Sequence, residues 1–228
     1  MDFVTKCKAL KYGKISFDLP REDYREFTSI DEVEAWGKEK YELWEKTYRS
    51  TFQTAGLLRK KGDYNPVSEY LGETYQQINN TLRGFADEEN DAIRFLINDL
   101  LIAISSAPII GEKIVLYRQV SEEVIQEIVS RNKSDDSPYQ EKGFMSTSMM
   151  KMCCAENCGS EKYMLKMYVE DLNPIHAIFA NVIDPRDEEE LLLRPGLFIR
   201  LSGYPYADKE TGKIIYEVQV YSMDKKYF

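Results

Sequence analysis

The sequence predicts an α+β fold in which N-terminal helices pack on a mixed β-sandwich core. Apolar residues recur at helical spacing as far as Pro108, and short runs typical of strands dominate from there to the end. No flexible linker, internal repeat or low-complexity segment separates the two parts of the 228-residue chain. We therefore expect one domain, made of an N-terminal extension (1–28), a helical half (29–108) and a β-rich half (109–228).

Three helices are expected in the helical half. Ser29 and Glu32 have the spacing of a capping box and start the first helix. Its helical periodicity is carried by Val33, Trp36, Lys40, Tyr41, Trp44 and Tyr48. A Gly-Asp-Tyr-Asn-Pro loop at 62–66 precedes the second helix, whose apolar stripe is Val67, Tyr70, Leu71, Tyr75, Ile78 and Leu82. We expect Asp87 to cap the third helix, whose buried face is Ile93, Leu96, Ile97, Leu100, Leu101 and Ile104.

The β-rich half is predicted to begin with a strand at 114–120. A helix follows at 121–131 with Ser121 as its N-cap, and then a polar loop at 132–140. Further strands are expected at 143–149, 162–169, 174–180, 189–194, 197–202 and 213–222. Turn residues at 194–196 and 208–212 separate the last three of these strands.

Composition narrows the classes of partner. The net charge of −9 argues against nucleic acid, because phosphate backbones require clustered Lys and Arg. No segment is long and apolar enough to insert into a membrane. Residues 1–6 have no apolar region, so no secretory signal is visible; export by another route, retention in the cell and a removed signal all remain open.

Three of the four cysteines cluster as Cys153, Cys154 and Cys158, a spacing that invites a zinc site. A tetrahedral site needs a fourth ligand, and the single histidine, His176, lies in a different predicted strand. We therefore favour reduced thiols on a loop or short helix and expect no metal. One histidine also argues against a Ser-His-Asp triad, and we expect His176 to be structural.

Polar groups follow apolar strand residues in three places. Arg118 follows a buried run at 114–116, and its planar guanidinium suits bidentate capture of phosphate. Ser146 and Ser148 lie two residues apart, so both hydroxyls would face the same way in a strand. Glu188 and Glu190 are also two apart and would project to one side at about 6–7 Å.

These groups suit chemistry on a dinucleotide, since the arginine would bind phosphate and a serine would orient a carboxylate that steadies a cationic sugar. In this order they resemble the Arg, Ser-Thr-Ser and Glu-x-Glu signature of bacterial mono-ADP-ribosyltransferases. Residues 34–44, with Tyr70, Tyr75 and 78–83, resemble the first helices of the catalytic domain of iota-like and insecticidal binary toxins. The resemblance covers roughly residues 30–220.

The resemblance implies an ADP-ribosyltransferase fold and NAD as co-substrate, without a metal. It implies that Glu190 stabilises the cationic ribose, that Glu188 serves an acceptor arginine, and that Ser146 orients Glu190. Arg118 would grip the NAD phosphates or ribose. The NAD cleft would also be lined by Tyr70, Tyr75 and Asn79.

The resemblance also suggests a toxin or effector, secreted or injected, that acts in a target-cell cytoplasm on an arginine of a host protein. Actin is the leading target by family alone. Iota-like enzymes carry two such domains in tandem, whereas this chain has room for one. We therefore expect the part that docks a separate delivery component to be missing.

Three positions depart from the family pattern. Pro185 replaces an aromatic residue of the target-recognition loop, and Glu161 replaces an arginine that helps bind NAD, for which only Lys162 or Lys166 could substitute. Cys158 stands where an aromatic residue packs on nicotinamide.

The register Asp187/Glu189 competes with Glu188/Glu190. We prefer the latter because, in the family, an aliphatic triplet such as 191–193 directly follows the catalytic glutamate. Two other functions stay open: a non-catalytic binding module of the same fold, and an enzyme that mainly hydrolyses NAD.

Overall fold

The structure, a computed structural model, describes residues 3–13, 15, 19–58, 63–86, 90–134, 138–170 and 174–223. The N-terminal extension contains α1 (Phe3–Tyr12) and the 3-10 helix η1 (Arg21–Asp23). The long helix α2 (Ile30–Leu58) begins where the capping box predicts. Ser29 Oγ accepts a hydrogen bond from the Glu32 N–H at 3.3 Å, and the Glu32 carboxylate accepts one from the Thr28 N–H at 3.4 Å.

The second predicted helix is divided into three segments: α3 (Pro66–Glu69), the π-helical turn η2 (Tyr70–Thr74) and α4 (Tyr75–Arg83). The division is a kink at Gly72, whose ψ of −132° is not helical. Tyr75 follows the kink and is 44% exposed, so it does not belong to the buried stripe that the periodicity predicts.

Helix α5 (Asp91–Ser106) begins later than predicted. Its N-cap is Asn90, whose Oδ1 accepts hydrogen bonds from the N–H groups of Ala92 and Ile93 at 3.0 and 3.3 Å. The prediction of Asp87 as the cap is therefore wrong, and Asp87 itself lies outside the described residues. The predicted face is buried except for Leu101, which is 37% exposed.

The β-rich half contains every predicted strand. In chain order the elements are β1 (Ile114–Val120), α6 (Glu122–Ser134), β2 (Tyr139–Glu141), β3 (Met145–Ser148), α7 (Lys151–Asn157), β4 (Tyr163–Val169), β5 (Ala177–Phe179), the 3-10 helix η3 (Ala180–Val182), β6 (Glu190–Leu193), β7 (Leu197–Leu201), β8 (Tyr206–Ala207) and β9 (Ile214–Tyr221). The predicted polar loop at 132–140 is wrong at both ends, because α6 runs on to Ser134 and β2 starts at Tyr139; residues 135–137 lie outside the described part.

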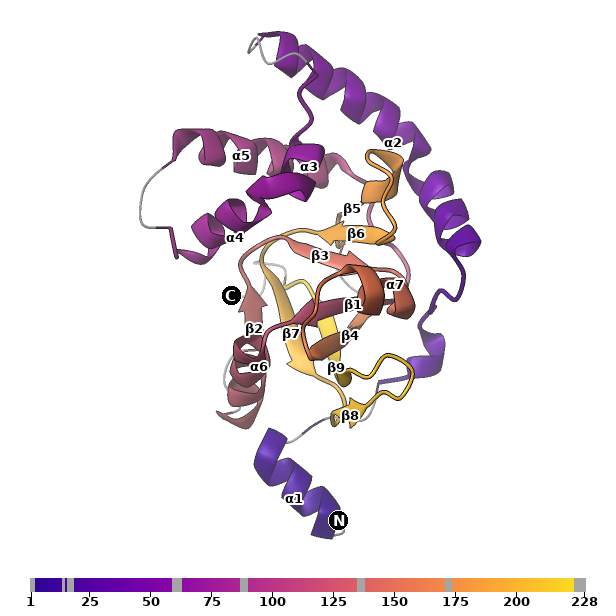
Figure 1. Cartoon of the computed structure of the whole chain (residues 1–228), viewed down its shortest axis with the longest axis vertical. Helices are drawn as coiled ribbons and strands as arrows, with labels where there is room; N and C mark the ends of the chain where they lie inside the picture. The colour runs from indigo at the N-terminus through magenta and orange to yellow at the C-terminus, as the bar shows by residue number, and fades with distance from the viewer. Residues whose placement is uncertain are drawn as a thin grey trace.

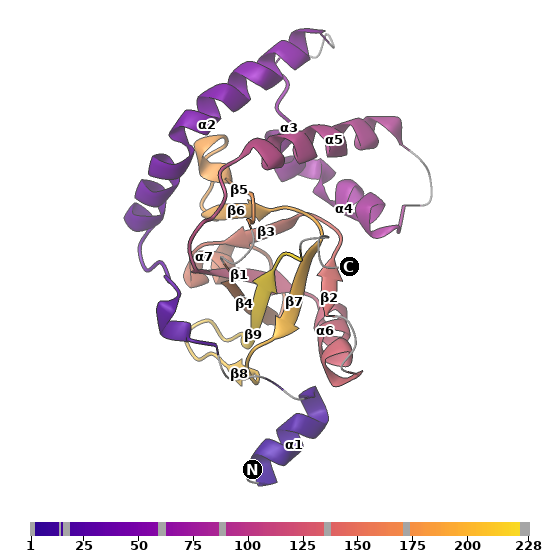
Figure 2. The same ribbon diagram turned by 180° about the vertical axis from the view of Figure 1, so that it is seen from behind.

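The strands form one mixed sheet in the order β2-β7-β9-β4-β1-β3-β6-β5, with β8 beside β9 (Figure 1). Among the strands that the structure describes, β4 and β9 pair in parallel and the other pairs are antiparallel. β1 and β3 share the single residue pair Tyr117↔Ser148. At this point the sheet divides into a larger part, formed by β2, β7, β9, β4 and β1 with β8, and a smaller part, formed by β3, β6 and β5. Helices α3, α4 and α5 gather beside the smaller part, and α1 lies at the opposite end of the molecule (Figure 2).

One hydrophobic core joins the helices to the sheet. Helix α2 approaches β5 closely at Gly37, where a Cβ atom would lie 2.1 Å from the Phe179 ring. Trp36 packs edge-on against the same ring at 6.3 Å between centroids. This contact fixes the helical half against the smaller part of the sheet. None of the described helices has the length and apolarity needed to cross a membrane.

Candidate active site

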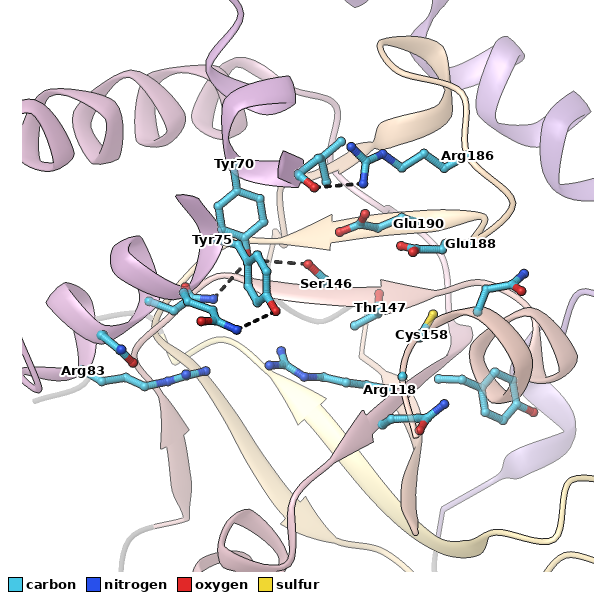
Figure 3. A pocket seen from close by; sticks show the side chains of 18 residues that line it. Tyr70, Tyr75, Arg83, Arg118, Ser146, Thr147, Cys158, Arg186, Glu188 and Glu190 are labelled. Atoms are coloured by element: carbon cyan, nitrogen blue, oxygen red, sulfur yellow. Dashed lines mark hydrogen bonds between the residues drawn. The ribbon is translucent and has the colours of Figure 1, made fainter. Parts of the chain in front are cut away.

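A cleft with a cavity of about 520 Å³ lies between α4 and the strands β1, β3 and β6. Every residue that the sequence predicts for the site lines it, as Figure 3 shows. The helical half contributes Tyr70, Tyr75 and Asn79, and the β-rich half contributes Arg118, Ser146, Glu188 and Glu190. The structure thus brings together side chains that are more than a hundred positions apart in the sequence.

Arg118 comes from β1 and reaches into the cleft from below in Figure 3. Its Nη1 atom is buried and has no hydrogen-bond partner among the residues that the structure describes. A buried guanidinium nitrogen without a partner is costly unless an anion binds to it. Arg118 lines the cleft, and its planar guanidinium is a group that can bind a phosphate.

The helical wall of the cleft is held to the sheet by Asn79. Its Oδ1 accepts a hydrogen bond from the Phe144 N–H at 2.8 Å, and its Nδ2 donates to the Phe144 carbonyl at 3.3 Å. The same Nδ2 lies 3.1 Å from the Tyr70 hydroxyl, which is 3.5 Å from Ser146 Oγ. Tyr70 and Asn79 are buried, whereas Tyr75 stands at the exposed rim.

Neighbouring strands fix the carboxylates of the cleft. Glu190 is the first residue of β6, and Ser148 of β3 lies opposite it. Ser148 Oγ donates to the Glu188 carbonyl at 2.6 Å, and Thr147 Oγ1 donates to the Leu191 carbonyl at 2.6 Å. These two hydroxyls therefore hold the backbone on both sides of Glu190.

The backbone turns sharply between the two glutamates. Glu189 has a φ of 46°, a left-handed conformation that is uncommon for a residue other than glycine. This turn places Glu188 in the cleft although it precedes the strand, and it sends the Glu189 side chain to a buried position elsewhere. Glu188 and Glu190 line the cleft, whereas Asp187 and Glu189 do not.

Burial controls the charge of Glu190, which is 3% exposed. Burial raises its pKa from an ordinary 4.5 to about 7. The Ser146 hydroxyl and the guanidinium groups of Arg186 and Arg118 oppose this shift, while Glu188 adds to it. Its Oε1 has no hydrogen-bond partner within the described part of the chain.

Sequence reasoning missed two further arginines of the cleft, Arg83 and Arg186. Arg83 lies one helical turn after Asn79, a spacing that could have indicated the same face. It forms a bidentate pair with Glu141 at 2.9 and 3.0 Å. Arg186 precedes Glu188 by two residues but lies in no regular element, so no periodicity pointed to it.

Of the three departures, only Cys158 lines the cleft. Its thiol pKa is raised by a hydrogen bond with Cys154 and by burial, which keeps it neutral. Pro185 and Glu161 are exposed outside the cleft.

The two lysines that could replace the missing arginine are not in the cleft either. Lys166 pairs with Glu26 at 2.7 Å, and Lys162 lies over the Tyr163 ring.

Cys153 and Cys154 are buried residues of α7, Cys158 is its C-cap residue, and all described cysteines are free. Across the described ranges, no group of three or more His, Cys, Asp or Glu residues is arranged to hold a metal. His176 Nδ1 lies 2.6 Å from the Ala107 carbonyl, away from the cleft.

The cleft therefore combines the guanidinium of Arg118, one nitrogen of which has no hydrogen-bond partner in the described part of the chain, with the carboxylates of Glu188 and Glu190. The guanidinium can bind a phosphate, and the carboxylates can stabilise a positive charge that develops in a bound substrate. A molecule that carries both groups, such as a dinucleotide with a cationic base, fits this arrangement.

Comparison with known proteins identifies the family. The profile of the ADP-ribosyltransferase exoenzyme family matches residues 33–221. The fold is similar to BECa, an ADP-ribosylating toxin of a C. perfringens binary enterotoxin solved with NADH, with a TM-score of 0.63 and 19% identity over 91% of this chain. This chain spans 50% of BECa.

It is also similar to C3stau2 from S. aureus, solved with NAD, with a TM-score of 0.65 and 17% identity over 88% of this chain and 100% of that one. Plx2a, a toxin from Paenibacillus larvae, gives a TM-score of 0.63 and 14% identity over 92% of this chain and 100% of that one. Among curated protein sequences, none matches significantly. From its sequence profile and its fold, the chain belongs to the ADP-ribosyltransferase exoenzyme family of bacterial toxins.

Proposed function

We propose that this protein transfers ADP-ribose from NAD to an arginine of a host protein and releases nicotinamide. The observation that carries the proposal is the meeting of Arg118, Glu188 and Glu190 in one cleft, with buried Arg118 and Glu190 atoms that have no partner in the described chain. Similar proteins have been solved with NAD or NADH, which supports the same co-substrate here.

Arg118 is proposed to bind the NAD phosphates, and the tyrosines of the helical wall to line the nicotinamide end of the cleft. The bond between the anomeric carbon of the ribose and nicotinamide breaks with its electron pair on the nitrogen. Positive charge then grows on the sugar, and the Glu190 carboxylate stabilises it more in the transition state than in the ground state. Ser146 orients this carboxylate from β3.

Glu188 is proposed to receive the acceptor. Its carboxylate can pair with an incoming guanidinium, which an amide at this position could not neutralise. As a guanidinium nitrogen forms its bond to the anomeric carbon, a proton leaves that nitrogen for Glu188 and then for water. The proposal specifies the acceptor by its arginine side chain, and actin is a candidate target from the family resemblance.

We further propose that the protein acts as a toxin or effector in a target cell. The fold is also similar to C2-I, the enzymatic component of the C2-toxin from Clostridium botulinum, with a TM-score of 0.57 and 17% identity over 83% of this chain and 48% of that one. We therefore propose delivery by a separate component as one route by which this chain enters a target cell.

The test is incubation with NAD labelled in its adenosine part and a eukaryotic cell lysate, followed by mass spectrometry of the labelled protein. We expect one or a few labelled proteins, modified on arginine, and no labelling by the Glu190→Gln variant. Release of nicotinamide without labelled protein would indicate an NAD hydrolase instead. Neither labelling nor nicotinamide release would indicate a binding module.

A further inference from the structure

Arg186 connects the two sides of the cleft. It lies in the segment 183–189, hereafter the glutamate loop, which joins η3 to β6 and carries Glu188. Its Nη1 donates a hydrogen bond to the Leu71 carbonyl of the helical half at 2.9 Å, as Figure 3 shows. Its Nη2 pairs with Asp184 of the same loop at 3.2 Å. The guanidinium therefore links the loop to the opposite wall.

The acceptor of this bond lies at a break in the helical wall. Leu71 belongs to the π-helical turn and directly precedes the kink at Gly72. Its neighbour Tyr70 is buried and faces Ser146 across the cleft at 3.5 Å. The Arg186 bond thus joins the loop that carries Glu188 to the turn that carries Tyr70.

The base of the Arg186 side chain is also fixed. Asn181 Nδ2 donates to the Arg186 carbonyl at 2.9 Å, which holds the loop from behind. The guanidinium lies near Glu190 in the cleft, and its positive charge lowers the pKa of Glu190 against the effect of burial. Arg186 therefore acts on both glutamates, on Glu188 through the backbone and on Glu190 through its charge.

We propose that Arg186 is a positioning residue that ties the glutamate loop to the helical half and so holds Glu188 and Glu190 in register with a bound substrate. The proposal rests on the proposed transferase function. In that function a small displacement of the carboxylates relative to the ribose lowers the rate without much change in NAD binding. Lysine keeps the charge but cannot form both bonds, and glutamine lacks the charge.

Arg49 offers a matched control. From α2 its Nη2 donates to the carbonyls of Val182 and Ile183 at 3.1 and 3.2 Å, so it anchors the start of the same connection. It does not line the cleft. Arg49→Gln therefore removes guanidinium-to-carbonyl bonds of the same kind without changing the charge that faces Glu190.

The experiment compares Arg186→Gln, Arg186→Lys and Arg49→Gln with the wild type in NAD hydrolysis and protein labelling across pH. For Arg186→Gln we expect kcat to fall roughly 10- to 100-fold, KM for NAD to change little, and the acid-side midpoint of the pH profile to move to higher pH. Arg186→Lys should restore the midpoint and only part of kcat. Arg49→Gln should keep the wild-type midpoint and nearly all of the activity.

Hydrogen exchange measured without NAD tests the positioning role of Arg186 independently of the proposed transferase function. In Arg186→Gln, exchange should accelerate both in the glutamate loop and in 70–74, while Arg49→Gln should leave 70–74 unchanged. An unaltered kcat and pH midpoint, a change confined to KM for NAD, or unaltered exchange in 70–74 would overturn the positioning role. A wild-type protein that neither labels nor hydrolyses would overturn the proposed function, and exchange alone would then decide whether Arg186 holds the two walls together.

Discussion

Replacing Glu190 by glutamine keeps the shape of the side chain and removes its charge, so two opposite effects are expected. Glu190 is 3% exposed, and one of its oxygens has no partner in the described part of the chain. Burial raises its pKa from 4.5 to about 7. A buried carboxylate of this kind is useful for catalysis and costly for folding.

The stability effect has a definite sign. A carboxyl group with a raised folded pKa binds its proton more tightly in the folded state, so its contribution to stability is present at low pH and is lost as pH rises from 4.5 through about 7. The raised pKa of Glu190 would cost roughly 3 kcal/mol of stability at pH 8 and roughly 1 kcal/mol at pH 5, relative to a side chain that stays neutral. Glu190→Gln should therefore raise the melting temperature by up to about 10 °C at pH 8, and by less at pH 5.

The catalytic effect has the opposite sign. Loss of the charge that opposes the cationic ribose would cost roughly 3–4 kcal/mol of transition-state stabilisation, several hundredfold in rate. Nicotinamide release and thermal unfolding, measured on one preparation at pH 5 and pH 8, check both effects. Near-normal NAD hydrolysis, or a variant no more stable than the wild type at pH 8, would refute this reasoning.

Glu189→Gln is the matched control. Burial also raises the pKa of Glu189 to about 7, and the negative charges of Glu34 and Asp187 add to the shift. Glu189 does not line the cleft. The variant should gain stability at alkaline pH like Glu190→Gln and should keep its activity.

Four further outcomes are expected. Glu188→Gln should lose transfer to arginine and keep much of the NAD hydrolysis, since water needs no carboxylate to hold it. Parallel assays of the two activities check this, and equal losses of both would assign Glu188 to NAD binding. By calorimetry, NAD should bind to the wild type equally well with and without a chelator, and loss of binding with the chelator would contradict a metal-free site. By the same measurement, Arg118→Gln should weaken NAD binding at least about tenfold. Asn79→Ala should lower stability by about 2–3 kcal/mol, because it leaves the buried Phe144 backbone groups without their partner; an unchanged denaturation midpoint would contradict this.

The arginine of β1 and the serine of β3 could be predicted from the sequence because Arg118 and Ser146 each lie within a short strand with buried neighbours. Strand period alone did not choose Glu190 over Glu189; that choice rested on the aliphatic triplet 191–193, which follows the catalytic glutamate in the family that the sequence resembles. The start of α2 was predictable from a local pattern, since the capping box of Ser29 and Glu32 acts over three residues.

Other features depend on contacts that no local pattern contains. β2 is only three residues long and exists because it pairs with β7, some sixty positions later. The kink at Gly72 interrupts what the periodicity presents as one helix. Arg186 lies in no regular element, and its hydrogen bond joins it to Leu71, more than a hundred positions earlier in the chain. Tertiary contacts, not local propensity, decide these positions.

The most direct test of the central claim is a crystal structure of the protein with NAD or a non-hydrolysable analogue. We expect the phosphates at the Arg118 guanidinium, the ribose of the nicotinamide end within hydrogen-bond distance of Glu190, and Glu188 facing the open side where an acceptor arginine would enter. A dinucleotide bound outside this cleft, or one with its adenosine end at Glu190, would contradict the account.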